Sequence, residues 1–240
     1  MLSPMYVSCV MPTTARRRWC IPWAIEYFLA QRYTTNELLI VSDGEGSVED
    51  LIPESMRIRH AHFVNPMPLG AKYNRCVELA TYDWIALWAD DDWHAPHRLR
   101  YTMAMLKRDP QKEIAGLRSM LFHQMGTDRT FRYARPGNDP YFLGGSLIFS
   151  RAYWERHGFD EEAKRHADSS FTNGIDPDEY ARVATVLQDD RFYVAMNHGD
   201  NTGRSGRLDP SGPGWSRWDG NLLELMGSRV ARRYLRRDHA

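Results

Sequence analysis

The stretch WIALWADDDWHAP (Trp84–Pro96) places three carboxylates directly after six apolar residues. The apolar run predicts a buried strand over 84–89. Asp90, Asp91 and Asp92 then lie together at its carboxyl end, where like charges repel strongly because water is partly excluded. A divalent cation such as Mg²⁺ or Mn²⁺ would relieve this repulsion, since these ions prefer oxygen ligands. The alternative is that the triplet caps a following helix, because carboxylates favour helix N-termini.

Apolar runs on both sides of this strand predict an α/β fold. We expect further strands at 6–11, 37–42, 58–64, 141–150 and 192–196, and helices at 19–31, 71–80 and 151–157. Continuous apolar strands that alternate with helices indicate a mainly parallel, Rossmann-like sheet flanked by helices. Such sheets bind ligands beyond the carboxyl ends of their strands, where Thr13, Asp43 and the aspartate triplet fall.

The composition is that of a globular protein without an overall charge. Of its 240 residues, 42% are hydrophobic, and 31 Lys and Arg balance 31 Asp and Glu, so no net field attracts nucleic acid or membranes. No apolar run approaches the roughly 18 residues of a membrane span, and we expect a cytoplasmic protein. Cys9, Cys20 and Cys76 lack metal-binding spacing and are predicted to be free, buried thiols.

Four segments resemble, in this order, the pattern of family 2 glycosyltransferases: VSCVMPTTARR, ELLIVSDGEGS, LGAKYNRCVELATYDWIALWADDDWHAPHRL, and GGSLIFSRAYWERHGFDEE with HADSSF. The resemblance implies a single GT-A domain over 1–240, with a nucleotide-binding half at 1–96 and a less regular acceptor-binding half at 97–203. Residues 204–240 would form a flexible loop and a C-terminal helix. The implied reaction is metal-dependent, inverting transfer of a sugar from a nucleoside-diphosphate sugar, most often a UDP-sugar, to an acceptor hydroxyl. The acceptor stays open among a glycan, a lipid-linked molecule, a protein and a modified nucleic acid.

The resemblance also assigns roles to single residues, with Mn²⁺ or Mg²⁺ as the cofactor. Donor-binding positions fall on Pro12, Thr13, Thr14, Asp43, Lys72, Asn74, Asp90, Asp91 and Gly145. Asp92 lies four residues before Pro96 and matches the metal ligand of the family. His198 follows the late strand and is expected to complete the metal site through a neutral imidazole. The alternative for His198 is a structural or exposed histidine.

Inversion needs a base on the face opposite the leaving group, to take the proton of the acceptor hydroxyl. The family carries a Glu-Asp pair after its glycine-rich strand, and here that position reads Ala167-Asp168, which makes Asp168 the candidate base. Alternatively, Asp168 caps a helix that starts at Ser169. Asp189 and Asp190 are the rival bases, although their position is typical of a surface turn.

The C-terminal region combines a glycine-rich loop with a basic helix. Residues 202–221 hold five glycines and two prolines and predict a loop, in which Trp215 and Trp218 either stack on a substrate or pin the loop to the core. The run SRVARRYLRR predicts a helix with an arginine face. This face is either simply solvated or a docking strip for an anionic acceptor, nucleic acid or membrane.

Two other functions fit parts of the sequence. A sugar nucleotidyltransferase would need a glycine-rich phosphate loop after the first strand, and PTTARRR contains no glycine. A non-catalytic module that binds a nucleotide sugar or a glycan also stays open. It does so because Ala89 and Ala167 stand where the family often has acidic residues.

Overall fold

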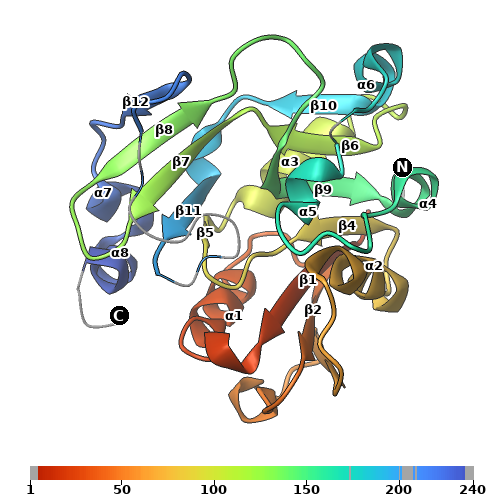
Figure 1. The fold of residues 1–240 in the computed structure, drawn as a ribbon, viewed down its shortest axis with the longest axis vertical. Coiled ribbons are helices and arrows are strands. Elements are labelled where there is room, and N and C mark those ends of the chain that lie inside the picture. Colours follow the sequence, from red (N-terminus) through yellow and green to blue (C-terminus); the bar gives the residue numbers. More distant parts are fainter. Residues whose placement is uncertain (1–4, 173, 200, 202–207, 209, 236–240) are drawn as a thin grey trace.

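The computed structural model describes residues 5–172, 174–199, 201, 208 and 210–235. Its centre is a seven-stranded sheet with the strand order β10-β6-β9-β4-β1-β2-β3 (Figure 1). The strands are β1 (Val7–Thr14), β2 (Asn36–Asp43), β3 (Ile58–Phe63), β4 (Trp84–Leu87), β6 (Ile114–Leu117), β9 (Leu143–Ser150) and β10 (Ala184–Leu187). Only β9 runs antiparallel to its neighbours in this sheet. The mainly parallel α/β fold is therefore confirmed.

Helices cover both faces of this sheet. They are α1 (Ile21–Leu29), α2 (Leu69–Leu79), α3 (Arg98–Leu106), α4 (Arg151–His157), α5 (Ala167–Ser170) and α6 (Pro177–Val183). Along β1, Cys9 and Met11 face the core that contains α1 and α3, whereas Val10 faces the core that contains α2, α4, α5 and α6. Burial of this kind stabilises the fold by about 1.5–3 kcal/mol for each large apolar side chain.

A five-stranded sheet with the order β12-β8-β7-β11-β5 extends the molecule on one side (Figure 1). Its strands are β5 (Trp93–His94), β7 (Ser119–Gln124), β8 (Thr130–Ala134), β11 (Tyr193–Asn197) and β12 (Trp215–Arg217). Helices α7 (Leu222–Met226) and α8 (Ser228–Leu235) follow β12. The hydroxyl groups of Tyr234 in α8 and Tyr27 in α1 form a hydrogen bond of 2.7 Å. The second sheet, α7 and α8 thus share one core with the α1 face of the first sheet.

The predicted strands and helices are confirmed to within a few residues at their ends. One difference is that β1 continues through Pro12 to Thr14. Pro12 is tolerated because β4 pairs with β1 only as far as Val10, so beyond that point β1 is paired with β2 alone. The predicted loop over 202–221 lies partly outside the described residues, and its described part contains β12.

The cysteine prediction is confirmed, since Cys9, Cys20 and Cys76 are free and buried. Burial raises the pKa of the Cys9 thiol to about 12, which keeps it protonated and unreactive. Burial also raises the pKa of Cys20 and Cys76. Within the described part of the chain, no helix combines the length and apolar character that a membrane crossing requires.

The arginine face of α8 is partly occupied by contacts within the chain. Arg229 and Arg233 both pair with Glu26 of α1. Val230 and Tyr234 of the same helix pack against the core. Arg236 and Arg237, also part of the predicted face, lie outside the described residues.

Gly70 provides a test of the packing of α2. Its amide donates to the carbonyl of Ala163 at 2.9 Å, and a Cβ atom here would overlap the backbone of Asp160. We expect Gly70→Ala to lower the free energy of unfolding by about 1–3 kcal/mol, as overpacking does elsewhere. Gly212→Ala is the control, because its Cβ would meet only ordinary contacts. Thermal unfolding checks both, and equal melting temperatures for the two variants would contradict this packing.

Candidate active site

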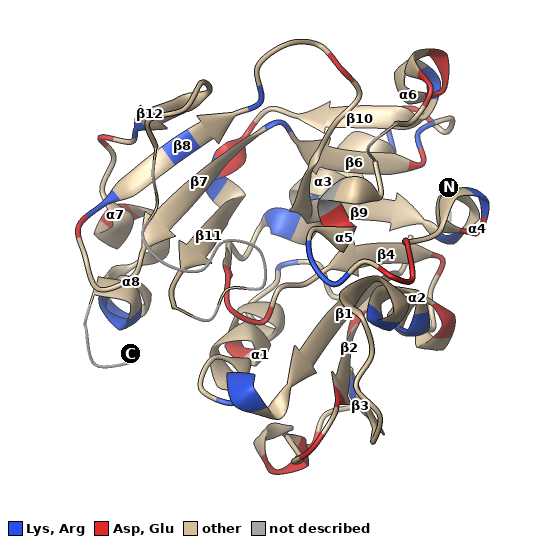
Figure 2. Cartoon of the chain, viewed as in Figure 1, with Lys and Arg blue, Asp and Glu red and all other residues tan. Residues whose placement is uncertain are grey.

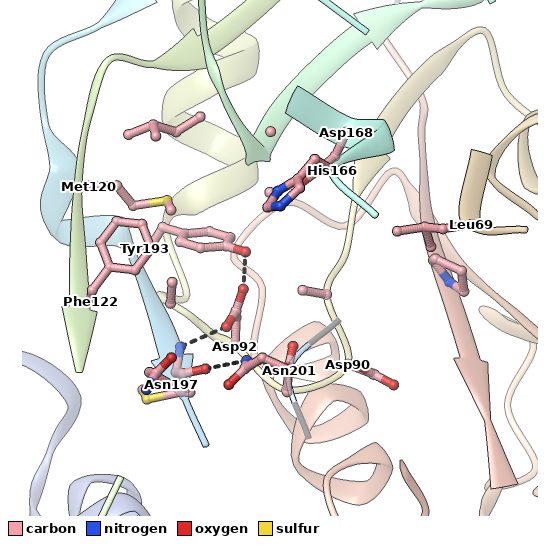
Figure 3. Close-up of a pocket in the computed structure, with 18 of the residues that line it drawn as sticks. Leu69, Asp90, Asp92, Met120, Phe122, His166, Asp168, Tyr193, Asn197 and Asn201 are labelled. Atoms are coloured by element: carbon pink, nitrogen blue, oxygen red, sulfur yellow. Dashed lines mark hydrogen bonds between the residues drawn. The ribbon is translucent and has the colours of Figure 1, made fainter. Parts of the chain in front are cut away.

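A pocket of about 600 Å³ lies at the carboxyl ends of β1 and β4, between the two sheets (Figure 3). Most of the predicted site residues line it: Pro12, Thr13, Thr14, Lys72, Asp90, Asp91, Asp92, Gly145 and Asp168. The triplet does not cap a helix, because α3 begins at Arg98 with His97 as its N-cap residue. The capping alternative for the triplet is therefore wrong.

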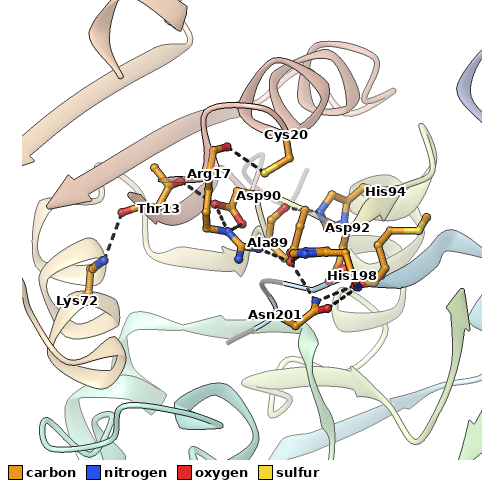
Figure 4. A network of polar contacts seen from close by, with 12 residues as sticks. Thr13, Arg17, Cys20, Lys72, Ala89, Asp90, Asp92, His94, His198 and Asn201 are labelled. Atoms are coloured by element: carbon orange, nitrogen blue, oxygen red, sulfur yellow. Dashed lines mark hydrogen bonds and ion pairs between the residues drawn. The ribbon is translucent and has the colours of Figure 1, made fainter. Parts of the chain in front are cut away.

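Asp90 points toward the end of β1. Its carboxylate accepts a hydrogen bond from the Thr13 hydroxyl at 2.6 Å and another from Arg17 Nε at 2.8 Å (Figure 4). Burial raises the pKa of Asp90, although the Arg17 guanidinium opposes this shift. Thr13 and Asp90 thus form the polar floor of the pocket beside β1.

Asp91 points toward the segment that follows β11. Its Oδ2 atom pairs with Arg17, lies 2.9 Å from His198 Nε2 and also contacts Asn201. Burial favours the neutral acid, but the Arg17 charge and the His198 contact outweigh it and lower the pKa of Asp91 to about 2. Asp91 therefore stays ionised throughout the physiological range.

Asp92 turns to the second sheet. Its two oxygens accept hydrogen bonds from the Tyr193 hydroxyl and from the Met196 amide, the latter at 2.8 Å (Figure 3). Burial and the neighbouring Asp91 carboxylate raise the pKa of Asp92 well above its usual range. The sequence analysis expects Asp92 and His198 to bind one metal together. In the structure His198 faces Asp91 instead.

Arg17 is the residue of this cluster that the sequence analysis did not single out. It belongs to η1 (Ala15–Arg17), a single turn that follows β1 and carries the guanidinium between Asp90 and Asp91. The surrounding carboxylates raise its pKa against the opposing effect of burial. The sequence does contain a signal for Arg17: it is a basic residue one turn beyond β1, and the end of β1 was expected to lie near the three carboxylates.

At the end of the pocket beside β1 and β2, Lys72 is fixed by two groups from neighbouring strands. Its Nζ atom donates to the Thr13 carbonyl at 3.2 Å and pairs with Asp43, which also accepts from the Met67 amide at 2.7 Å. Lys72 lines the pocket, and Asp43 lies directly behind it. Both residues thus lie at the carboxyl ends of β1 and β2, and their binding of a donor stays a prediction.

Asn74 is the predicted donor-binding residue that the structure does not bring to the pocket. Its side chain donates to the Phe159 carbonyl and accepts from the Phe159 amide and from Trp154 Nε1, each at 2.9 Å. These bonds hold α2 against α4 and the turn that follows it. The prediction for Asn74 is wrong, because its three hydrogen bonds are structural.

Asp168 enters the pocket because the glycine pair of β9 leaves room for it. A Cβ atom on Gly144 would overlap the Asp168 side chain, and one on Gly145 would overlap the Tyr193 hydroxyl. Arg98 holds this turn of β9 by donating to the Gly145 carbonyl at 3.0 Å. Asp168 lies within α5 and not at its N-cap position, which His166 takes, so the capping alternative is wrong.

His166 precedes Asp168 and also lines the pocket (Figure 3). With a φ of 57°, it is the one non-glycine residue with a positive φ in the described part of the chain. Such backbone conformations persist where surrounding structure enforces them, often at functional sites. The rival bases lie elsewhere: Asp189 caps a turn, and Asp190 pairs with Arg132 at 2.7 Å.

The donor atoms of Asp91 and His198 fit a divalent ion. Asp91 Oδ2 and His198 Nε2 lie 2.9 Å apart, and a carboxylate oxygen with an imidazole nitrogen is a donor set that would suit Mn²⁺. The Arg17 guanidinium also shows that a cation is accommodated between Asp90 and Asp91. In the described ranges no group of three or more His, Cys, Asp or Glu side chains forms a metal site. Two protein ligands would therefore need diphosphate oxygens and water to complete the coordination.

Solved structures of similar fold are glycosyltransferases. TarS 1-349 from S. aureus, in complex with UDP-GlcNAc, superimposes with a TM-score of 0.62 at 16% identity, covering 85% of this chain and 60% of that one. A mannosyltransferase from Pyrobaculum calidifontis, PcManGT, in complex with GDP-Man and Mn²⁺, gives 0.56 at 16% identity, covering 80% and 56%. The chain thus spans about 60% of the TarS fragment, and the likeness shows a shared GT-A fold.

No curated protein matches the chain significantly in sequence. A sequence model of one family, described as Glycosyl transferase family 2, matches residues 8–157. This match includes β1, β2, the acidic triplet and the glycine pair of β9, and it covers more than half of the chain. The chain therefore belongs to glycosyl transferase family 2.

Proposed function

We propose that the chain transfers a sugar from a nucleoside-diphosphate sugar to an acceptor hydroxyl with inversion, assisted by a divalent metal. The observation that carries this proposal is the position of Asp168 in the same pocket as the acidic triplet. An inverting transfer needs these two parts, a stabilised diphosphate leaving group and a base for the acceptor. Two similar structures were solved with UDP-GlcNAc and with GDP-Man, which supports a nucleotide-sugar donor, and we favour a UDP-sugar.

The donor would lie across the nucleotide end of the pocket. Asp90 is held by Thr13 and Arg17, so its carboxylate is preorganised to accept hydrogen bonds from ribose hydroxyls. Arg17 and Lys72 supply positive charge where the diphosphate would lie, and both line the pocket. These side chains would orient the donor and stabilise the charge that grows on its leaving group.

Asp91 and His198 would hold the metal, in place of the expected pair of Asp92 and His198. When bound, the ion acts as a Lewis acid toward the departing diphosphate. Asp91 is ionised and its Oδ2 atom lies 2.9 Å from His198 Nε2, whereas the oxygens of Asp92 face Tyr193 and the Met196 amide on β11. Asp92 would instead position Tyr193 and β11 around the site.

Asp168 would act as the base that removes the proton from the acceptor hydroxyl. Gly144 lets α5 approach β9 closely, so the carboxylate reaches into the pocket from a rigid backbone. The proton would pass from the acceptor oxygen to the Asp168 carboxylate as that oxygen attacks the anomeric carbon from the face opposite the diphosphate.

The metal assignment predicts different effects for the aspartates. We expect Asp91→Asn and His198→Ala each to weaken Mn²⁺ binding in the presence of UDP by about tenfold or more. Asp92→Asn is the matched control and should leave Mn²⁺ affinity unchanged, because its oxygens face Tyr193 and Met196. Electron paramagnetic resonance of free Mn²⁺ measures all three. Loss of binding in Asp92→Asn alone would contradict the assignment.

Asp92 also predicts a dependence of stability on pH. Its folded-state pKa lies above the unfolded value, so its contribution to stability is present at low pH and is lost as pH rises through the folded pKa. Asn removes the titration, and its oxygen can accept from the Met196 amide while its NH2 group donates to the Tyr193 hydroxyl. We therefore expect the metal-free Asp92→Asn variant to gain stability over the wild type as pH rises from 4 to 8, with about 2–4 °C in Tm for each kcal/mol. A variant less stable than the wild type at pH 8 would refute this.

The base assignment predicts a defect in transfer without a defect in donor binding. We expect Asp168→Asn to lower sugar transfer by about 10²–10⁴-fold, the usual contribution of a general base. Its UDP affinity, measured by calorimetry, should match the wild type. Asp189→Asn is the control, because Asp189 caps a turn outside the pocket. Unimpaired transfer by Asp168→Asn would rule out this role.

A further inference from the structure

One face of the five-stranded sheet forms the end of the pocket that lies away from the nucleotide. In a sheet, alternate residues share a face, and residues opposite each other on neighbouring strands do so too. Tyr133 of β8 lies opposite Met120 of β7 and opposite Trp215 of β12. Phe122, two residues after Met120, shares this face. All four side chains line the pocket.

Three of these four side chains are aromatic and form a continuous apolar surface, which we call the aromatic floor: Phe122, Tyr133 and Trp215. The Trp215 ring lies 5.1 Å from the Phe122 ring and 5.0 Å from the Tyr133 ring, centroid to centroid. Gly214, with a φ of 87°, permits this approach, because a Cβ atom there would overlap the Ala134 carbonyl. The three rings are only half-buried, so part of their surface remains open to the pocket.

The polar groups at the edge of the floor are paired with each other. Arg135 forms an ion pair with Asp139 at 2.7 Å and lies over the Tyr141 ring at 4.4 Å. Arg118 also lies 3.8 Å from Asp139, so two guanidinium groups share this carboxylate. The cluster offers donors and an acceptor, which suits hydroxyl groups, since these both donate and accept. Strand β7 itself has no Lys, Arg, Asp or Glu, and Arg132 of β8 pairs with Asp190 (Figure 2).

The floor is continuous with the chemical centre of the pocket. Strand β11 lies beside β7, with Ala195 opposite Phe122. Tyr193, two residues before Ala195, shares that face and donates its hydroxyl to Asp92. A molecule that rests on the floor therefore lies in the same pocket as Asp168 and the triplet.

We infer that the aromatic floor binds a pyranose ring of a neutral glycan acceptor. The C–H groups of one sugar face would pack on Trp215, because aromatic faces carry partial negative charge and C–H groups partial positive charge. The sugar hydroxyls at the ring edge would meet Arg135 and Asp139. This inference rests on the proposed function, since it names the acceptor for the same pocket.

Binding of neutral disaccharides tests the floor directly. The probes are cellobiose, N,N′-diacetylchitobiose and mannobiose, with octyl phosphate as the anionic lipid-like comparison. Saturation-transfer NMR and tryptophan fluorescence report binding, with and without UDP and Mn²⁺. We expect at least one disaccharide to bind the wild type and Trp215→Ala to weaken it about tenfold, as loss of a stacking ring does elsewhere.

Matched variants separate stacking from folding. Trp215→Phe keeps a ring and should retain most of the disaccharide affinity. Trp218→Ala removes a tryptophan outside the pocket and should leave the disaccharide affinity unchanged. Tyr133→Ala gives a second test should Trp215→Ala loosen β12, and melting temperatures check the fold of each variant.

The inference is overturned if no disaccharide binds, if binding survives both Trp215→Ala and Tyr133→Ala, or if octyl phosphate binds the floor in place of the sugars. UDP affinity separates this result from the proposed function. Normal UDP binding without sugar binding refutes the floor alone. Absence of UDP binding in the wild type counts against the donor site, while the floor is still judged by disaccharide binding without UDP.

Discussion

Three consecutive carboxylates at the buried end of β4 impose the constraint on which this pocket depends. Each must find a partner, because desolvated like charges in contact destabilise the fold. The partners come from distant parts of the chain: Thr13 and Arg17 after β1 for Asp90, and Tyr193 on β11 for Asp92. Satisfying the triplet therefore brings the two sheets together around one pocket.

The sequence predicts the local parts of this arrangement. It also contains the information that argues against Asn74 as a donor-binding residue. Continuous apolar runs identify β1, β2 and β4, and strand polarity places Thr13 near Asp90. The family resemblance assigns both Lys72 and Asn74 to binding of the nucleotide-sugar donor. Residues two apart on a helix, however, point to nearly opposite sides. Lys72 faces β1, so Asn74 must face away.

Other parts depend on contacts between residues about a hundred positions apart, which spacing does not encode. The family resemblance implies Asp92 as the metal ligand, but the register of β11 gives its oxygens to Tyr193 and Met196. Strands β7, β8 and β12 are not among the predicted strands, because their sequences SMLFHQ, TFRYA and WSR lack a continuous apolar run. Their pairing, and with it the aromatic floor, could be recognised only in three dimensions.

The two ends of the pocket differ in how they hold a ligand, and this difference follows from the two sheets. The parallel sheet supplies charge at its strand ends, with Arg17 and Lys72 balanced against carboxylates. Arg17 and Lys72 already have carboxylate partners, so they can bind a diphosphate only if its negative charge competes with those carboxylates. The second sheet offers instead a face of aromatic rings, whose attraction needs contact area and not charge. Tyr193 belongs to that face and donates its hydroxyl to Asp92, so this one hydrogen bond joins the two ends of the pocket.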